Sequence, residues 1–215
     1  MDTIPGLKKS YRLKKGEITK RLLDFKRAGR SAEIRVFEEL CFCLLTPGAK
    51  AENCKKIIAC LKQKKLLLSG SRRRLGPFLK HARFYDQKAC RLVEARKFFS
   101  SGKRISIKKR LSCGTPSVVR DWLVDNVKGL GYKEASHFLR NVGLGEEFAI
   151  LDRHILKRLK GYGAIDEVPK SLTPKKYLEI EDRMKAFSGR IKIPMGHLDL
   201  LFFSKATGKP VRSCK

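Results

Sequence analysis

The chain has 215 residues, enough for one well-packed domain or two small lobes, with 50 Lys and Arg against 21 Asp and Glu and a formal net charge of +29. This excess favours a polyanionic partner, with nucleic acid ahead of a merely solvated surface or a ribosome-like structural role. No stretch approaches the roughly 18 uncharged apolar residues of a membrane span, and no apolar signal segment opens the chain. We therefore expect a soluble, cytoplasmic protein with no membrane partner.

The chain opens with MDTIPGLKKSYRLKKG, which is basic, short of large apolar residues and interrupted by Pro5 and two glycines. This composition predicts a flexible basic arm over residues 1–16, which either contacts phosphates or is simply a solvated tail. The remaining residues, 17–215, are predicted to form one helical domain in two lobes.

Beyond the arm, apolar residues recur at helical spacing, as at Ile34, Phe37 and Cys41, and no convincing strand alternation competes. Stops containing Pro or Gly, such as TPG at 46–48, divide the chain into roughly nine to eleven helices. The predicted fold class is all-α.

Cysteines and histidines give no sign of a metal site. The seven cysteines include no C-x2-C pair, and most stand among apolar residues, which is typical of reduced, buried side chains. The four histidines show no metal-ligand spacing. We expect neither a metal nor a cofactor.

The stretch VKGLGYKEASHFLRNVG at 127–143 places Leu130 between two glycines and a helical pattern on each side. The upstream helix is predicted to start with Ser117 as its N-cap, and the downstream helix to end at Gly143. Its apolar stripe consists of Ala135, Phe138, Leu139 and Val142. The pattern is that of a DNA-binding helix-hairpin-helix, and an ordinary αα-hairpin is the alternative.

Glycines let the turn approach a ligand closely, and the amides that open the second helix suit a phosphate. Basic and small residues around this turn and the next predicted helix start are the candidates for phosphate binding. They are Lys128, Gly129, Gly131, His137, Arg140 and Arg153.

Two side chains are candidates for catalysis. Lys133 directly follows GLGY, where the helix dipole and Lys128 favour the neutral amine, a nucleophile able to form a Schiff base. Asp152 follows an apolar run in FAILDRHILKRLK and precedes a new helix. It is predicted to be a helix N-cap, and the same carboxylate can also act as a general base.

These residues resemble the helix-hairpin-helix DNA glycosylase superfamily. KGLGYKEASHFLRNVG followed by AILDRHIL is similar to its archaeal-type 8-oxoguanine DNA glycosylase/lyase branch, as are ELCFCLLTPGAKAE, RFYDQKACRLVEAR and HLDLLFFSKATG, so the resemblance covers most of the chain. It implies a two-lobed helical fold with the active site in the cleft between the lobes.

The resemblance also implies an activity. Lys133 is the expected nucleophile at C1′ of the damaged nucleotide, and Asp152 is expected to assist by deprotonation and by stabilising positive charge at the sugar. Base loss would leave an imine, and β-elimination would then cut the strand 3′ to the site. The alternative is a helix-hairpin-helix protein that binds DNA or RNA without catalysis.

A flipped purine needs flat partners, and Phe84 and Phe203 align with the aromatic pair of the family; core packing is the alternative. The resemblance also assigns base recognition to the terminal carboxylate of Lys215, although KPVRSCK is longer than the family pattern. An iron–sulfur cluster needs four clustered cysteines, and only Cys214 stands near the C-terminus, so we expect no such cluster. The expected partner is double-stranded DNA containing 8-oxoguanine, bound by a nucleoid-associated monomer.

Overall fold

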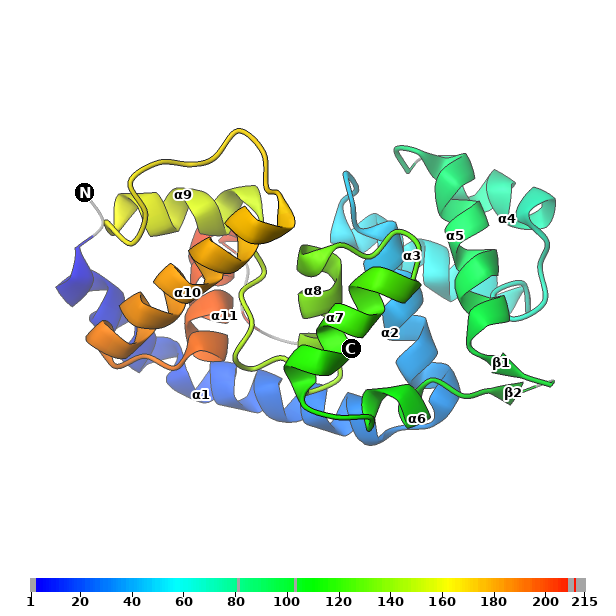
Figure 1. Cartoon of the computed structure of the whole chain (residues 1–215), viewed down its shortest axis with the longest axis horizontal. Helices are drawn as coiled ribbons and strands as arrows, with labels where there is room; N and C mark the ends of the chain where they lie inside the picture. Colours follow the sequence, from blue (N-terminus) through cyan, green and yellow to red (C-terminus); the bar gives the residue numbers. More distant parts are fainter. Residues whose placement is uncertain (1–2, 81, 103, 209–210, 212–215) are drawn as a thin grey trace. The chain divides into compact units, whose positions relative to one another are not determined.

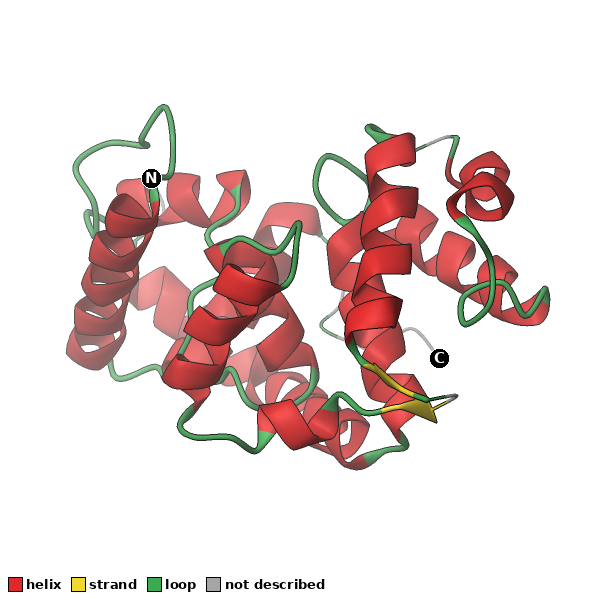
Figure 2. Ribbon diagram, turned by 45° about the vertical axis from the view of Figure 1, so that its right-hand side comes forward, coloured by secondary structure: helices red, strands yellow, loops and turns green. Residues whose placement is uncertain are grey.

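The computed structural model describes residues 3–80, 82–102, 104–208 and 211. Within these residues the chain forms eleven α-helices and one pair of two-residue strands (Figures 1 and 2). The all-α prediction is confirmed. No helix in the described part of the chain is long and apolar enough to cross a membrane.

The chain divides into two compact units. One comprises Arg30–Phe138, and the other combines Met1–Gly29 with Leu139–Lys215. The chain passes from one unit to the other at the end of α1 and inside α8.

The Arg30–Phe138 unit is built around α2, which is apolar on almost every face because side chains from other helices surround it. Helices α3 and α5 pack against α2, α4 packs against α3 and α5, and the β1–β2 hairpin precedes the short α6. The elements are α2 (Glu33–Leu45), α3 (Ala51–Gln63), α4 (Arg72–Leu79), α5 (Tyr85–Phe98), β1 (Ser100–Ser101), β2 (Arg104–Ile105), α6 (Lys108–Leu111), α7 (Pro116–Asn126) and most of α8 (Tyr132–Asn141).

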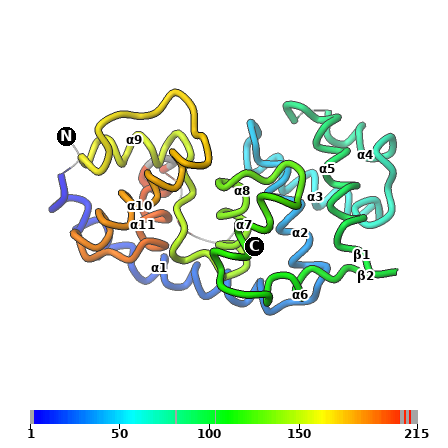
Figure 3. Tube along the Cα trace, in the orientation of Figure 1, coloured from blue at the N-terminus to red at the C-terminus, as the bar shows by residue number. Residues whose placement is uncertain are grey.

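The second unit packs α11 against α9 and α10, with a core that includes Met184, Leu198 and Phe202. An extended run leads from α8 into α9, and a longer loop joins α9 to α10 (Figure 3). The helices are α1 (Ile4–Arg30), α9 (Arg153–Gly161), α10 (Pro174–Ile191) and α11 (Met195–Thr207).

The flexible arm predicted for residues 1–16 is wrong, because Ile4–Arg30 is one continuous helix. Leu7 is fully buried on the same face as Ile18. On α1, the Tyr11 hydroxyl lies 3.1 Å from His197 Nδ1, and Lys14 donates to the Ser204 hydroxyl. These contacts join residues more than 180 positions apart. Composition within a 16-residue window could not reveal them.

The prediction of buried, reduced cysteines holds for part of the set. Cys41, Cys43 and Cys54 are free and buried, whereas Cys113 is exposed and its thiol donates to the Lys109 carbonyl. Cys214 lies outside the described residues.

Leu7→Ala should lower the free energy of unfolding by about 2–5 kcal/mol, because it removes a buried side chain and leaves a cavity. Leu13→Ala is the matched control on the same helix, where the side chain is 78% exposed, and it should change stability by less than about 0.5 kcal/mol. Chemical denaturation of both variants checks this. Equal stability in the two would mean that the start of α1 does not contribute to the fold.

Candidate active site

Helix α7, which opens the predicted hairpin, begins two residues earlier than expected. Its N-cap is Thr115, whose hydroxyl accepts from the Val118 amide at 3.4 Å, with Pro116 at the first helical position. The prediction of Ser117 was wrong because threonine is also a favoured N-cap and proline is preorganised for the first helical residue.

The turn between α7 and α8 confirms the predicted hairpin. Leu130 is buried, and its amide donates to the Val127 carbonyl at 3.0 Å. Gly129 has φ +93°, a backbone angle that residues other than glycine rarely adopt. Gly131 directly precedes α8 and accepts from the Ala135 amide at 2.9 Å, so that α8 begins immediately after the second glycine.

Lys133 is the second residue of α8, and its side chain is 27% exposed. Its Nζ lies 3.2 Å from Glu134 Oε1. The Glu134 carboxylate also reaches back toward the start of the helix, because a Cβ built on Gly131 would lie 3.5 Å from Glu134 Oε2. A carboxylate there is favourable at the positive end of the helix dipole. The candidate nucleophile thus lies at the hairpin beside one carboxylate.

Other predicted phosphate ligands also lie at this hairpin. Lys128 is exposed and pairs with Glu94 at 3.4 Å. Arg91 lies against the turn, since a Cβ on Gly129 would meet its Cδ; the sequence analysis did not single out this residue. His137 is half-buried, with its ring in edge contact with Phe42 at 5.8 Å.

A buried lysine also escaped the sequence analysis. Lys88 on α5 is 1% exposed, and its Nζ donates to the Pro47 carbonyl at 2.7 Å. Burial lowers the pKa of this amine. Burial also raises the pKa of the nearby Cys54 thiol, and the positive charges of Lys88 and Lys133 oppose that rise. Through its hydrogen bond to the Pro47 carbonyl, Lys88 holds the TPG loop (residues 46–48) that follows α2.

Phe84 immediately precedes α5 and has the left-handed backbone angle φ +59°. Its ring is 55% exposed and lies under the Arg83 guanidinium, 4.7 Å from the ring centroid. The alternative that it packs into the core does not hold.

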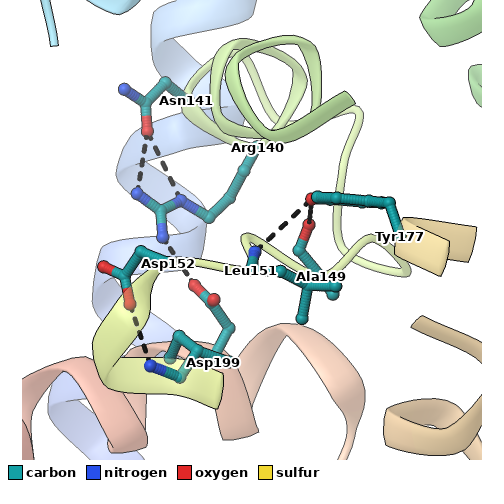
Figure 4. Close-up of polar contacts among 8 residues, drawn as sticks. Arg140, Asn141, Ala149, Leu151, Asp152, Tyr177 and Asp199 are labelled. Atoms are coloured by element: carbon teal, nitrogen blue, oxygen red, sulfur yellow. Dashed lines mark hydrogen bonds and ion pairs between the residues drawn. The ribbon is translucent and has the colours of Figure 1, made fainter. Parts of the chain in front are cut away.

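In the other unit, Asp152 is the N-cap of α9, as predicted. Its Oδ1 accepts from the amides of His154 and Ile155, both at 2.8 Å, which leaves Oδ2 outside the cap (Figure 4). Arg153, the first residue of α9, is exposed.

The segment leading to Asp152 is held by two buried side chains of α10. The Tyr177 hydroxyl donates to the Ala149 carbonyl at 2.6 Å and lies 3.4 Å from the Leu151 amide (Figure 4). The Ala149 amide donates to Glu181 Oε1 at 2.8 Å. Both backbone groups of Ala149 are therefore satisfied by side chains.

Arg140 does not lie on the surface but in an ion pair with Asp199 of α11, at 2.6 Å. The Arg140 guanidinium also contacts the Asn141 side-chain carbonyl at 3.3–3.4 Å (Figure 4). Burial raises the pKa of the Asp199 carboxyl, Arg140 opposes this rise, and the Asp152 charge adds to it. Phosphate binding by Arg140 stays a prediction.

Phe203 on α11 is 41% exposed, and Lys215 lies outside the described residues. One unit thus contains Phe84, Lys128 and Lys133, and the other contains Asp152 and Phe203. Among the described residues no group of three or more His, Cys, Asp or Glu side chains could hold a metal ion.

The helical architecture and the two-glycine hairpin define a helix-hairpin-helix DNA glycosylase fold. A family model for 8-oxoguanine DNA glycosylase matches residues 18–193. The chain belongs to the 8-oxoguanine DNA glycosylase family. A curated relative from Fusobacterium nucleatum, named 8-oxoguanine DNA glycosylase/AP lyase, is 44% identical over 206 residues, which cover 94% of each chain.

Solved structures agree with this assignment. The chain is similar to the Methanocaldococcus jannaschii 8-oxoguanine glycosylase/lyase in complex with a 15mer DNA containing 8-oxoguanine, with a TM-score of 0.84 and 39% identity over 96% of this chain and 99% of that one. The 8-oxoguanine DNA glycosylase of Thermotoga maritima gives a TM-score of 0.80 at 32% identity, covering 96% and 97%.

Gly129→Ala should reduce the free energy of unfolding by about 1–2 kcal/mol, since alanine is strained at positive φ and its Cβ would collide with Arg91. Gly16→Ala is the control, because Gly16 lies inside α1 with open space around it, and this variant should gain about 0.5–1 kcal/mol. Urea denaturation compares the two. A loss in the control, or none at Gly129, would contradict the assignment of strain to the turn.

Proposed function

We propose that this chain removes 8-oxoguanine from double-stranded DNA and then cleaves the strand at the resulting abasic site. The observation that carries the proposal is Lys133, a partly exposed amine in the first turn of the hairpin's second helix. Membership of the family and the names of its relatives support the same reaction.

Binding is the first step. The amides of the GLG turn and the side chains of Lys128, His137 and Arg153 contact phosphates. Gly129 and Gly131 let the backbone approach the DNA closely. Arg140 is a further candidate for phosphate binding. A base inside a duplex is out of reach, so the damaged nucleotide is flipped out at a cost of about a few kcal/mol. Phe84 and Phe203 stack on the flipped base.

Base removal follows. The neutral Lys133 amine attacks C1′, the bond from C1′ to the base nitrogen breaks, and its electron pair leaves with the base, which takes up a proton. The negative charge of Asp152 stabilises the positive charge that develops on the sugar as the base leaves, and Asp152 then accepts the proton released from the lysine nitrogen.

Strand cleavage uses the same covalent bond. The C1′–O4′ bond opens as the nitrogen forms a C=N double bond, and O4′ takes up a proton. Removal of a proton from C2′ then drives loss of the 3′ phosphate by β-elimination. Water finally hydrolyses the imine, which regenerates the amine.

We further propose that the chain acts as a cytoplasmic monomer. The net charge of +29 disfavours contact between two copies and favours accumulation on DNA.

Lys133→Gln should abolish borohydride trapping on a duplex that contains one 8-oxoguanine, because an amide nitrogen cannot form the imine. Lys128→Gln removes a lysine from the other side of the same turn and should keep the trapped band at saturating protein. Gel electrophoresis measures the trapped band for both variants and for the native chain, and undamaged duplex is the DNA control. Intact binding without a trapped band in the native chain would favour the non-catalytic helix-hairpin-helix alternative.

Duplex affinity should fall steeply with salt, by about 1000-fold or more between roughly 50 and 200 mM if about six phosphates are contacted. Fluorescence anisotropy at several salt concentrations measures the slope. A flat dependence would contradict binding dominated by phosphates.

A further inference from the structure

We infer that Lys88 is a positioning residue, which holds the exposed ring of Phe84 in place through the TPG loop and Arg83. The inference rests on the proposed function, in which Phe84 stacks on the flipped base. Lys88 is only 1% exposed, so it acts on the reaction without touching the DNA itself.

The Lys88 amine lies in the interior without a carboxylate beside it. Among the described residues, its hydrogen-bond partner is the Pro47 carbonyl, at 2.7 Å. Lysine is almost never fully buried unless its amine is paired, and an apolar side chain of similar volume would fill the same space without the cost of desolvating a charge. Packing alone therefore does not account for a lysine here, and what the amine adds is its bond to the loop.

The TPG loop in turn contacts Arg83. Gly48, which follows Pro47, has φ +63°, and a Cβ built on it would lie 3.4 Å from Arg83 Cδ. At the start of the loop, the Cys54 thiol donates to the Leu45 carbonyl at 3.4 Å. The loop is thus held from two sides and lies against the aliphatic stem of Arg83.

Arg83 completes a ring of contacts that ends at Phe84. Its guanidinium lies over the Phe84 ring, 4.7 Å from the centroid. In the first turn of α5, the Phe84 carbonyl accepts from the Lys88 amide at 3.0 Å. Lys88 therefore reaches Phe84 by two routes, one through the backbone of α5 and one through the loop and Arg83. Because the Phe84 ring is 55% exposed, burial in a core does not fix it, and these contacts do.

The first variant is full-length Lys88→Met, which keeps the length and the apolar stem but cannot donate to the loop. Since it also removes a buried charge, we expect it to stay folded. Lys97→Met is the matched control, because Lys97 stands on the same helix with an exposed side chain and the variant loses the same charge.

The second variant, Gly48→Ala, disturbs the loop without touching the lysine. Alanine is strained at this positive φ, and its Cβ would press on Arg83. Gly102→Ala is its control in the same unit, since Gly102 has a similar φ of +59° with open space around it.

Two reactions are compared under single turnover, at temperatures where far-ultraviolet circular dichroism shows each variant folded. One is release of 8-oxoguanine from a duplex. The other is borohydride trapping on a duplex with a preformed abasic site, where no base has to be stacked. Lys88→Met and Gly48→Ala should slow base release on the order of 10- to 100-fold and leave trapping nearly unchanged. Both control variants should match the native chain in both reactions.

A double variant separates positioning of Phe84 from a general structural role. If Lys88 acts through Phe84, adding Lys88→Met to Phe84→Ala should slow base release by less than about 2-fold, because the ring that it holds is already gone. A structural role would instead multiply the two losses.

A native rate of base release in Lys88→Met, equal losses in the two reactions, or multiplied losses in the double variant would overturn the inference. If Lys88→Met does not fold, Gly48→Ala decides by the same comparisons, alone and combined with Phe84→Ala. A native chain that neither releases the base nor forms a trapped band would overturn the proposed function itself. An active native chain with unaffected variants would overturn only the role of Lys88.

Discussion

Backbone amides and carbonyls inside a protein must find hydrogen-bond partners, and this constraint shapes the unit that contains Asp152. Residues 148–152 cross the interior of that unit without belonging to a helix or a sheet. The amides of Phe148 and Asp152 donate to nearby backbone carbonyls. The backbone groups of Ala149 and the amide of Leu151 instead bond to the side chains of Tyr177 and Glu181. The cost of burying these polar groups is offset because each one satisfies a backbone group that would otherwise have none.

In the hairpin unit, by contrast, the position of the candidate nucleophile depends on residues that are close together in the sequence. Its turn needs a positive backbone angle at Gly129, an apolar plug at Leu130 and a helix that starts at once, and all three lie within five consecutive residues. Lys133 is then placed by the geometry of one helical turn. The nucleophile candidate depends on short-range geometry, whereas the carboxylate candidate depends on contacts between helices.

This difference explains what the sequence could and could not predict. The hairpin, the N-cap at Asp152 and the end of α8 near Gly143 follow from residue types at fixed local spacing, and the structure agrees with each. The continuous α1 and the Arg140–Asp199 ion pair depend on residues 59 or more positions apart, which no local pattern encodes. The charged residue in LDLLFF was the one available signal for Asp199, because a lone carboxylate in an apolar helix needs a buried partner.

The left-handed backbone of Phe84 has a consequence for how stability is distributed in this protein. A side chain in that region costs about 1–2 kcal/mol relative to glycine, and the exposed ring recovers little of this by burial. Glycine or asparagine would suit the fold better at this position. The backbone at residue 84 therefore does not favour phenylalanine, and a strained, exposed ring at this position agrees with the stacking role proposed for Phe84.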